Sequence, residues 1–383
     1  MLRVEVISQL SAGDRLVEEW SELAEACPYS TVFQTAEWLV PWWTIIGRRR
    51  AGSTLYLITV RDGESLVGLL PLVLSRLRRL SFMGVGVSDY HDAVAQPGHE
   101  DEICAAIYSF LREARGWSVL DLRELREGGL LRERKPMPST GLACSDWPLE
   151  ACPYLDLPAD VPAGERWQKL LGAYSKKTRS NINYYERNLQ RAFTVESRVI
   201  SCESELAGSF ERLFELHRRR WSRRWLPGVF TSERLQSFHV EAGRRLLQRG
   251  RLRLHALSLD GKIQAALYAF AFHDRTCYYQ GGFEPELSRY SLGAVVIASA
   301  VRRAAEEGFE TFDFLRGNEE YKQRWTRGAH RTNIRRFITV GEGVALKQAE
   351  IMHRIANAAE TQLKRWFAGG IVRRAPRQAK TDD

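Results

Sequence analysis

The sequence lacks an apolar run that is long enough to cross a membrane, and it lacks a visible targeting segment. No stretch approaches the ~18 apolar residues that a membrane-spanning helix needs. The first ten residues, MLRVEVISQL, show no basic segment that leads into an apolar one. These absences argue against export or membrane insertion, so we expect a cytoplasmic protein.

Cysteine is also scarce, and its spacing carries no site signal. The six cysteines, at positions 27, 104, 144, 152, 202 and 277, form no C-x-x-C pair and have no histidine neighbours at zinc spacing. In a reducing compartment such residues remain free thiols. We therefore expect buried, reduced cysteines and no metal site.

The sequence does contain enough apolar residues for more than one core. Its 383 residues are 44% apolar and 27% charged, which at ~150 residues per domain predicts two or three compact units. The 56 basic and 47 acidic residues leave a net charge of +9. This surplus favours an anionic partner, such as a nucleotide, coenzyme A, an acidic lipid or RNA, without choosing among them.

Two halves of the chain repeat one order of elements. Each half contains two apolar, β-branched runs that flank an Asp-Gly pair, at 53–75 and at 251–272, and this pattern predicts a β-hairpin. The elements expected next are a loop at 82–98, a helix near 100–115 and a strand at 117–125 in the first half, and a strand at 276–283, a helix from about Ser291 and a strand at 310–317 in the second. The segment 126–160, which shows little periodicity, is expected to be the join.

Apolar spacing predicts three further helices. Residues 175–192 are basic, and residues 205–224 carry a buried helical stripe. Residues 344–367 predict a basic terminal helix, and beyond Gly370 we expect disorder. The apolar face of this terminal helix consists of Met352, Ile355, Ala359, Leu363 and Trp366.

The segment RYSLGAVVIASAVRRAAEEG, residues 289–308, opens its helix with small residues. Ser291 is a candidate N-cap, and Gly293 permits close approach to the backbone. Free N–H groups and the helix dipole at such a start attract phosphate. Most capped helices bind nothing, however, and the segment is neither a P-loop nor a full G-x-G-x-x-G motif.

Five motifs together carry a resemblance to a known family. They are VFQTAEWLVPWW (32–43), GVSDYHDAV (86–94), LHRRRWSRRWLPGVF (216–230), YYQGGFEPELSRYSLGAVV (278–296) and FDFLRGNEEYKQRW (312–325). With them the chain resembles the GCN5-related (GNAT) acyltransferase superfamily, in particular the CelD/BioF2-like acetyltransferase domain, which is akin to the FemAB-type tandem acyltransferases. The resemblance spans about residues 30 to 340.

The resemblance implies an α/β (α+β) fold of two tandem GNAT-like domains, each a mixed twisted sheet flanked by helices. We expect a degenerate GNAT-like domain at 1–155 and an acyl-CoA-binding one at 156–340. An amphipathic basic helix and a disordered tail are expected at 341–383. The resemblance does not name the acceptor.

The resemblance also implies a binding site for acyl-CoA, without a metal. In the superfamily the diphosphate lies on backbone amides of an R/Q-x-x-G-x-G/A segment. The corresponding positions here are Arg289, Ser291, Leu292 and Gly293, with the glycine one residue late. Arg289 is alternatively a solvated loop residue. Gly281 and Gly282 suit close approach of the pantetheine, or else they mark a bulge or a turn.

The stretch FDFLRGNEEYKQRW places polar groups at the end of a strand. If this strand lies next to the thioester, Tyr321 is placed to protonate the leaving thiolate, and Lys322 or Arg316 to stabilise negative charge. Alternatively, Asp313 and Arg316 form a structural ion pair while Tyr321 and Trp325 pack.

His217 is the candidate general base, because an imidazole titrates near neutral pH and because LHRRRW matches the family motif. Its alternative role is structural. Arg220 and Trp221, on the same turn, are assigned to the acceptor pocket. The loop residues Asp89, Tyr90 and His91 are predicted to form an acceptor-binding edge between the halves, unless Asp89 makes an Asx-turn. Tyr279 and Asp313 complete the predicted substrate-binding set.

Three functions are compatible with these features. The first is transfer of an acetyl or longer acyl group from acyl-CoA to an amine or hydroxyl of a polysaccharide, sugar or lipid amine such as a sphingoid base. Residues 344–378 are then able to rest on an anionic inner membrane face, although packing or dimerisation is the simpler role. The second is aminoacyl transfer from tRNA, as FemAB-like proteins perform, with basic runs at 176–181 and 217–224 on the RNA. The third is a non-catalytic binding module.

Overall fold

The computed structural model describes residues 2–11, 13–222, 228–341 and 343–358. The strands are β1 (Leu2–Ile7), β2 (Thr54–Asp62), β3 (Ser65–Leu74), β4 (Arg79–Phe82), β5 (Val94–Ala95), β6 (Val119–Leu125), β7 (Leu142–Asp156), β8 (Val195–Val199), β9 (Leu252–Leu259), β10 (Lys262–Phe272), β11 (Arg275–Phe283), β12 (Thr311–Asp313) and β13 (His330–Val340). The helices are α1 (Arg15–Ala26), α2 (Ala36–Ile45), α3 (Glu100–Glu113), α4 (Leu130–Glu133), α5 (Ala163–Gly172), α6 (Lys176–Ala192), α7 (Glu203–Ser222), α8 (Glu233–Gln248), α9 (Leu292–Glu306) and α10 (Glu320–Thr326).

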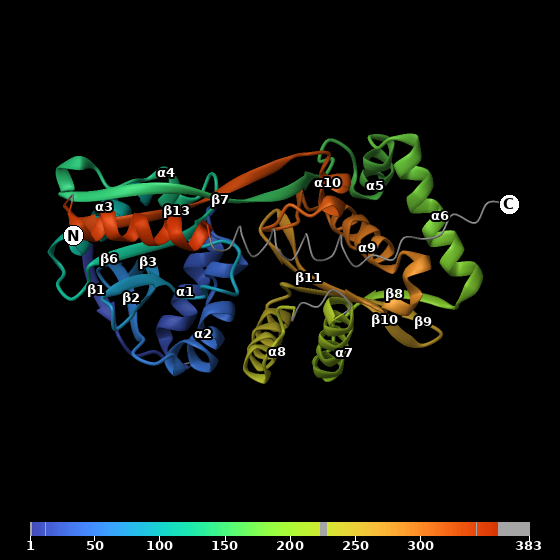
Figure 1. Ribbon diagram of the computed structural model, residues 1–383, viewed down its shortest axis with the longest axis horizontal. Coiled ribbons are helices and arrows are strands. Elements are labelled where there is room, and N and C mark those ends of the chain that lie inside the picture. Colours follow the sequence, from blue (N-terminus) through green and yellow to red (C-terminus); the bar gives the residue numbers. More distant parts are fainter. Residues whose placement is uncertain (1, 12, 223–227, 342, 359–383) are drawn as a thin grey trace.

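The strands form one mixed sheet that runs through the whole molecule (Figure 1). Their order is β1-β2-β3-β4-β6-β13-β7-β12-β11-β10-β9-β8, and β5 pairs with β3. Each half contributes an antiparallel series that ends in one parallel pair, β4 with β6 and β11 with β12. The predicted α/β class and the tandem arrangement of two similar halves are therefore confirmed.

The two halves exchange their last strands. β7 follows the first half in the chain, but it pairs with β12 of the second half. β13 follows the second half, but it pairs with β6 of the first, and β7 and β13 also pair with each other over most of their length. The long ribbon of β7 and β13 thus joins the halves by backbone hydrogen bonds.

Both predicted hairpins are present: Asp260 and Gly261 make the second turn, whereas Gly63 and Glu64 make the first, with Asp62 as the last residue of β2. Between β9 and β10, Asp260 and Gly261 have φ angles of 48° and 78°. Two successive positive φ angles match the right-handed twist of a two-residue hairpin, and Asp and Gly tolerate them best. Between β2 and β3, Gly63 has a φ of 56°.

The structure differs from the predictions at the join between the halves. Residues 126–160 were expected to be the join because they show little periodicity, but they contain β7, the longest strand of the sheet. β7 alternates buried and exposed residues weakly, because its ends lie in different halves. The predicted boundary at 155 falls at the end of this strand, and β13 of the predicted unit 156–340 lies beside β6. The division of the chain into units stays a prediction.

Helices cover both faces of the sheet. In Figure 1, α1, α2, α7 and α8 lie below the sheet, whereas α3, α5 and α9 lie above it. α2 packs against α8 at the centre of the lower face, where Trp38 is fully buried. The Trp38 ring lies 4.8 Å from the Phe238 ring and 5.3 Å from the Phe270 ring, centroid to centroid. One aromatic core therefore spans both halves.

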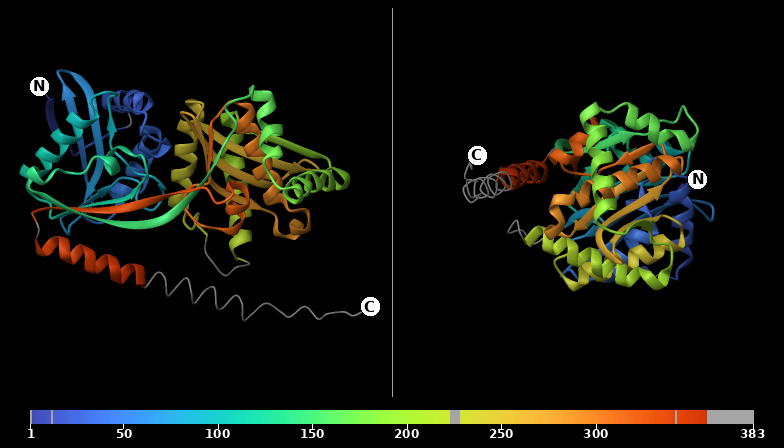
Figure 2. Two further views of the ribbon diagram at one scale, coloured as in Figure 1. Left: turned by 90° about the horizontal axis from the view of Figure 1, so that it is seen from above. Right: turned by 90° about the vertical axis from the view of Figure 1, so that its right-hand side faces the viewer.

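Residues 344–358 form a helix that lies along the edge of the first half (Figure 2). It is anchored by the buried His353, whose Nδ1 accepts a hydrogen bond from Arg335 at 2.9 Å. The His353 ring also lies beside Trp147, with centroids 5.1 Å apart. A polar residue thus fixes this helix to the sheet.

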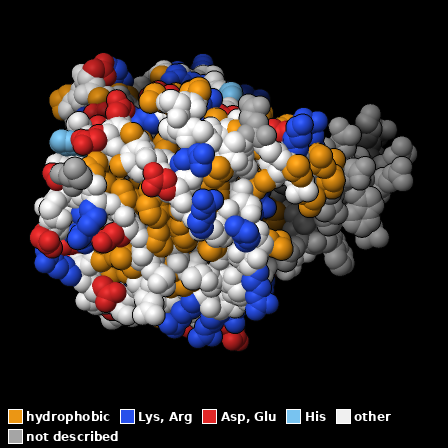
Figure 3. Space-filling model, turned by 90° about the vertical axis from the view of Figure 1, so that its left-hand side faces the viewer, with side chains coloured by type: hydrophobic (Ala, Val, Ile, Leu, Met, Phe, Trp, Pro, Cys, Tyr) orange, Lys and Arg blue, Asp and Glu red, His pale blue; other side chains and the backbone are white. Residues whose placement is uncertain are grey.

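The predicted apolar face of this helix does not pack on the protein. Met352 is 63% exposed and Ile355 is 57% exposed, and Ala359, Leu363 and Trp366 lie outside the described residues. Hydrophobic side chains of this helix are visible at the right of Figure 3, next to the residues drawn in grey. Packing on the body does not explain this face.

The structure bears on the expectations about membrane-spanning helices and about cysteines. No described helix is long and apolar enough to cross a membrane. All six cysteines are free thiols, and four of them are buried, whereas Cys144 is partly accessible and Cys202 is exposed. The expectation that the cysteines are buried is therefore wrong for Cys202.

We expect Trp38→Ala to lower the free energy of unfolding by about 3–5 kcal/mol, the usual cost of truncating a buried aromatic residue. Trp38 contacts both halves, so both should lose stability together in one urea transition. Leu77→Ala is the control, because Leu77 is 87% exposed and should change stability by less than ~0.5 kcal/mol. A loss confined to one of two separate transitions would contradict a shared core.

Candidate active site

The parallel strands β11 and β12 part after three paired residues. Arg275–Cys277 pairs with Thr311–Asp313. The chain after β12 then turns to β7, because the N–H groups of Phe314 and Gly317 donate to β7 carbonyls at 2.9 and 3.0 Å. Residues 278–283 of β11 consequently border a wedge in the sheet.

A cavity of about 420 Å³ lies at this wedge, within the size range of small-molecule sites. Its walls come from β11, from the first turns of α9, and from α6 and α10. The apolar lining consists of Ile182, Tyr185, Ala266, Tyr278, Phe283, Leu292, Val296, Ile297, Tyr321 and Trp325. Polar groups come from Thr178, Asn181, Arg220, Ser288, Ser291 and Arg324.

The start of α9 faces the cavity with free backbone donors. Ser291 adopts the left-handed conformation, with φ 54°, and its side chain makes no cap. Its carbonyl accepts from the N–H groups of Ala294 and Val295. The N–H groups of Leu292 and Gly293 donate to no acceptor within the described ranges. Two unpaired amides and the positive end of a 15-residue helix form a site for an anionic group.

The corresponding helix in the first half has the opposite character. α3 lies in the chain between the parallel strands β4 and β6, as α9 lies between β11 and β12, but its first turn carries Glu100, Asp101 and Glu102. Carboxylates satisfy the positive end of a helix and repel an anion. Of these two helix starts, only that of α9 is suited to an anion, and the predicted degeneracy of the first half stays a prediction.

The glycine pair of β11 has two different structural causes. A β-bulge interrupts the pairing with β10, since Tyr268 pairs with Gln280 and Ala269 with Tyr278, which leaves Tyr279 as the extra residue. A Cβ on Gly281 would lie 2.7 Å from the Tyr278 hydroxyl, and one on Gly282 would lie 2.6 Å from the backbone of α7. Gly281 thus makes room for a side chain of the cavity, and Gly282 for a helix.

Arg220 and Tyr321 both line the cavity, from α7 and α10 respectively. The Tyr321 hydroxyl shares a hydrogen bond with that of Tyr278, and burial raises the pKa of Tyr321 well above its usual value. Tyr321 therefore keeps its proton at neutral pH. Its predicted role as an acid is compatible with this position and stays a prediction.

His217 lies next to the cavity wall, but both ring nitrogens are engaged. Nδ1 bonds to the Gly281 carbonyl at 3.2 Å, and Nε2 accepts from the Val229 N–H at 3.2 Å. These partners fix the neutral tautomer. Burial lowers the pKa of His217 from 6.5 to about 4. The ring therefore has no free lone pair that could take a proton from an acceptor. This argues against the predicted role of His217 as general base and supports the structural alternative.

Lys322 and Arg316 lie away from the cavity. The buried Lys322 ammonium donates to the Arg316 carbonyl at 2.7 Å and pairs with Glu319 at 2.9 Å. The Arg316 guanidinium pairs with Glu124 at 2.9 Å and with Asp89 at 3.2 Å. Both cations are thus committed to protein carboxylates rather than to a ligand.

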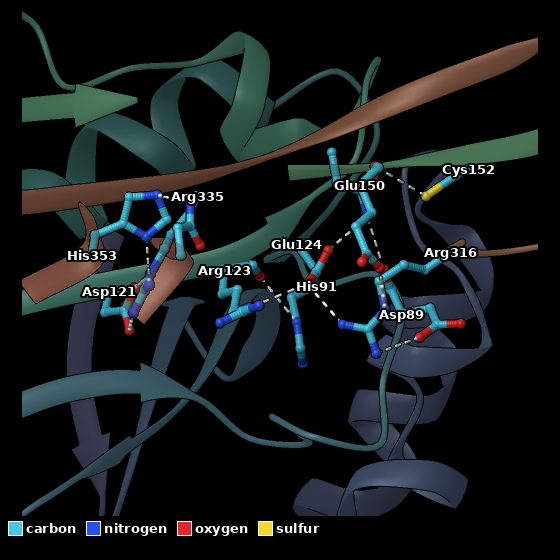
Figure 4. A network of polar contacts seen from close by, with 12 residues as sticks. Asp89, His91, Asp121, Arg123, Glu124, Glu150, Cys152, Arg316, Arg335 and His353 are labelled. Atoms are coloured by element: carbon cyan, nitrogen blue, oxygen red, sulfur yellow. Dashed lines mark hydrogen bonds and ion pairs between the residues drawn. The ribbon is translucent and has the colours of Figure 1, made fainter. Parts of the chain in front are cut away.

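The polar network around Arg316 joins the two halves (Figure 4). Arg316 comes from the second half, whereas Asp89, Glu124 and Glu150 come from the first half and from β7. Burial raises the pKa of Asp89 to about 6, in part offset by the charge of Arg316. The alternative that Arg316 pairs with Asp313 is not what the structure shows.

Asp313 and Tyr90 form a second bridge between the halves. The Tyr90 hydroxyl donates to both carboxylate oxygens of the fully buried Asp313, at 2.9 and 3.0 Å. His91 stacks on Phe82, with ring centroids 5.0 Å apart. The loop 88–92 is therefore placed as a connection inside the protein, not along the cavity.

The remaining predicted residues lie around the site without lining it. Tyr279 points to the opposite face of the sheet, where its hydroxyl donates to the Val87 carbonyl at 2.8 Å. Trp221 packs beside His217, with ring centroids 5.8 Å apart. Arg289 is exposed and donates to its neighbour Tyr290 at 3.0 Å.

Sequence reasoning missed several cavity residues, namely Thr178, Asn181, Ile182, Tyr185, Tyr278, Phe283 and Arg324. Tyr278 was missed because regular alternation along a strand would put Tyr279, not Tyr278, on the same face as Gly281. The bulge at Tyr279 puts Tyr278 and Gly281 on the cavity side instead. α6 was recognised as a helix, but its sequence does not reveal that it crosses over the start of α9. Within the described residues, no three potential metal ligands cluster.

The comparisons with known proteins agree with this geometry. Residues 176–323 match the family model described as the Acetyltransferase (GNAT) domain. This segment contains α6 to α9, β8 to β12 and every residue that lines the cavity except Arg324 and Trp325. Residues 176–323, within the second half of the chain, thus resemble a GNAT acetyltransferase domain.

Solved structures resemble the fold over nearly the whole chain. FemX is 11% identical, covers 90% of this chain and 99% of its own, and has a TM-score of 0.58. The C-terminal domain of a putative lysylphosphatidylglycerol synthetase from Agrobacterium fabrum is 13% identical and covers 88% of this chain and 94% of its own, with a TM-score of 0.55. L-PGS from Bacillus licheniformis is 10% identical and covers 88% of this chain and 96% of its own, with a TM-score of 0.53. No curated protein matches the sequence.

We expect the imidazole of His217 to titrate with a midpoint near pH 4, as its lowered pKa indicates. NMR of labelled histidine should show no change at His217 between pH 6 and 8, with His217→Asn as the assignment control. Because the folded-state pKa is lowered, unfolding takes up a proton between about pH 6.5 and pH 4. The contribution to stability is complete above this window and is lost as pH falls through it. A midpoint between pH 6 and 8 would restore His217 as a candidate base.

Proposed function

We propose that the chain transfers an acyl group from a phosphate-bearing donor in the cavity to an amine or hydroxyl acceptor. The observation that carries this proposal is the pair of free amides at Leu292 and Gly293, which face an apolar cavity at the point where β11 and β12 part. An anionic carrier bound at the amides directs its acyl group into the wedge. A GNAT domain match over the same residues supports this use of the site.

A CoA thioester is the donor that the cavity supports. The amides at α9 fit a diphosphate, and the apolar walls fit a pantetheine arm and an acyl chain. The unpaired N–H groups of Leu292 and Gly293 would donate to the diphosphate of CoA, so the residues present fit this donor. CoA would supply an activated thioester carbonyl, and the protein would hold and orient it.

An aminoacyl-tRNA is the donor that the whole-chain likeness favours. The proteins that resemble this chain with TM-scores above 0.5 include FemX and L-PGS, and FemAB-like proteins use charged tRNA. In support, α6 begins with the exposed Lys176 and Lys177, next to Thr178 in the cavity wall. Cations at the cavity mouth suit an RNA backbone. On these comparisons the tRNA donor has the broader support.

We expect Gly293→Val to weaken donor binding about tenfold or more, equivalent to ~1.4 kcal/mol. Even a Cβ at Gly293 would lie 3.1 Å from the Phe283 ring, so a larger side chain must cover the free amides. Titration with acetyl-CoA, palmitoyl-CoA and lysyl-tRNA would compare the donors. Gly208→Val is the matched control, since Gly208 lies in α7 with open space around it. Unchanged affinity in Gly293→Val for whichever donor binds would refute the site.

The exposed apolar side chains of helix 344–358 support an acceptor at a lipid surface. Val344, Ile351, Met352 and Ile355 are 70%, 54%, 63% and 57% exposed, and the i, i+7, i+8 and i+11 spacing puts them on one side of the helix. Lys347 and Arg354 add positive charge beside them. Such a helix side suits an anionic membrane surface, where a lipid amine is available as acceptor.

We expect the full chain to co-sediment with phosphatidylglycerol vesicles. The triple variant Ile351→Ser, Met352→Ser, Ile355→Ser should lose most of this binding without a change in melting temperature, because these side chains are exposed. Leu77→Ser is the control for loss of exposed apolar surface elsewhere. Equal binding by the triple variant would exclude this helix as the contact.

A further inference from the structure

Arg220 carries a positive charge into a mostly apolar cavity without a carboxylate partner in the described part of the chain. One guanidinium N–H approaches the Gly281 carbonyl at 3.4 Å, which is a weak hydrogen bond. Nε is buried and has no acceptor. The guanidinium lies over the Phe283 ring, 4.8 Å from its centroid. A buried donor without an acceptor is costly, so this group is expected to receive its acceptor from a ligand.

Two tyrosine hydroxyls lie beside this cation. Tyr278 forms hydrogen bonds with both Arg220 and Tyr321. Its hydroxyl lies over Gly281, where any side chain would displace it. Burial raises the pKa of both tyrosines, so both hydroxyls remain protonated and able to donate. The sequence Tyr278-Tyr-Gln-Gly281 thus builds a donor group into the strand.

The position of this group relative to the anion site is informative. The Phe283 ring lies against both Arg220 and Gly293, the latter at the start of α9. The cavity therefore has one group of donors for a phosphate and a second group further along β11, in the wedge. A donor that is held by its phosphate at α9 extends its acyl group toward Arg220 and Tyr278.

We propose that Arg220 and Tyr278 bind the carbonyl oxygen of the donor's acyl group and stabilise the oxyanion that forms during transfer. This inference rests on the proposed function and adds the residues that act on the reacting carbonyl. Neither side chain belongs to the helix start, and both differ from the cations Lys322 and Arg316, which are neutralised by protein carboxylates.

The chemical step is balanced without any further reactant. The lone pair of the neutral acceptor nitrogen or oxygen forms a bond to the carbonyl carbon, and the C=O π electrons move to oxygen, which Arg220 and Tyr278 hold. The oxyanion then re-forms C=O and breaks the bond from carbon to the leaving sulfur or oxygen. The leaving atom takes a proton from Tyr321, and the proton of the acceptor passes to water, from which Tyr321 is reprotonated.

The first test measures carbonyl polarisation without an acceptor. The probe is a ketone analogue of acetyl-CoA, in which a methylene replaces sulfur, labelled with ¹³C at the carbonyl. Bound to the wild type, it should show a downfield carbonyl shift, which is lost in Arg220→Ala and reduced in Tyr278→Phe. Arg218→Ala is the matched control, because Arg218 is an exposed neighbour on the same helix. If only charged tRNA binds, the probe is a 3′-aminoacylamino-adenosine with the same label.

The second test separates binding from catalysis. With the donor and acceptor that the wild type uses, Arg220→Ala should lower kcat by about 10²–10³-fold, the usual effect of removing an oxyanion donor, with little change in donor KM. Methylguanidine should restore part of the activity, because it fits the space left in the cavity. Arg220→Lys should remain impaired, since it lacks the fork of N–H groups.

The outcomes distinguish this inference from the proposed function. A wild type that binds neither probe refutes the proposed donor site, and the inference with it. Binding of the probe with an equal carbonyl shift in Arg220→Ala refutes the inference alone. A higher donor KM with unchanged kcat in Arg220→Ala assigns the guanidinium to the donor phosphate, and this also overturns the inference.

Discussion

The site depends on the parting of β11 and β12, and several independent features hold these strands apart. β12 keeps only three residues beside β11 because the following chain forms its hydrogen bonds with β7 instead. Leu315, at the point of divergence, has a φ of 56°, a strained conformation for a leucine that the surrounding structure must maintain. The Asp313 carboxylate accepts the Leu315 N–H at 2.8 Å and holds this turn. The bulge at Tyr279 then bends the other strand of the wedge.

The exchange of last strands explains why the first half matters to a cavity that it does not line. β7 belongs to the first half by sequence, yet it supplies the carbonyls that draw the chain after β12 away from β11. Tyr90 and Asp89 fix Asp313 and Arg316, on either side of the strained Leu315. The residues that sequence reasoning assigned to substrate binding in the loop 88–92 are thus placed to maintain the wedge. Their burial and their pairing account for their polar character without contact with a ligand.

Much of the fold is predictable from local sequence signals. The Asp-Gly turns, the apolar stripe of α7 and the small residues at the start of α9 each act over a few neighbouring residues, and all three appear where expected. β7 was not predictable, because its hydrogen bonds go to strands that are ~150 or more residues away and its burial changes along its length. Tyr278 was missed for a related reason: a single bulge, set by pairing with β10, exchanges the faces of the strand.

The two halves show how a duplicated fold separates binding from support. Both contain a hairpin and a parallel pair whose two strands are connected through a helix, α3 in the first half and α9 in the second. In the first half the helix start carries three carboxylates, which leaves no attraction for a phosphate. In the second half the helix start has free amides, and Arg220 remains without a carboxylate in a cavity of apolar side chains. Unsatisfied polar groups cost stability. The chain pairs Arg316 and Lys322 with carboxylates, but it leaves the amides at α9 unpaired and Arg220 without a carboxylate. It thus has unmet hydrogen-bonding capacity at the place where an acyl donor and its carbonyl would supply the partners.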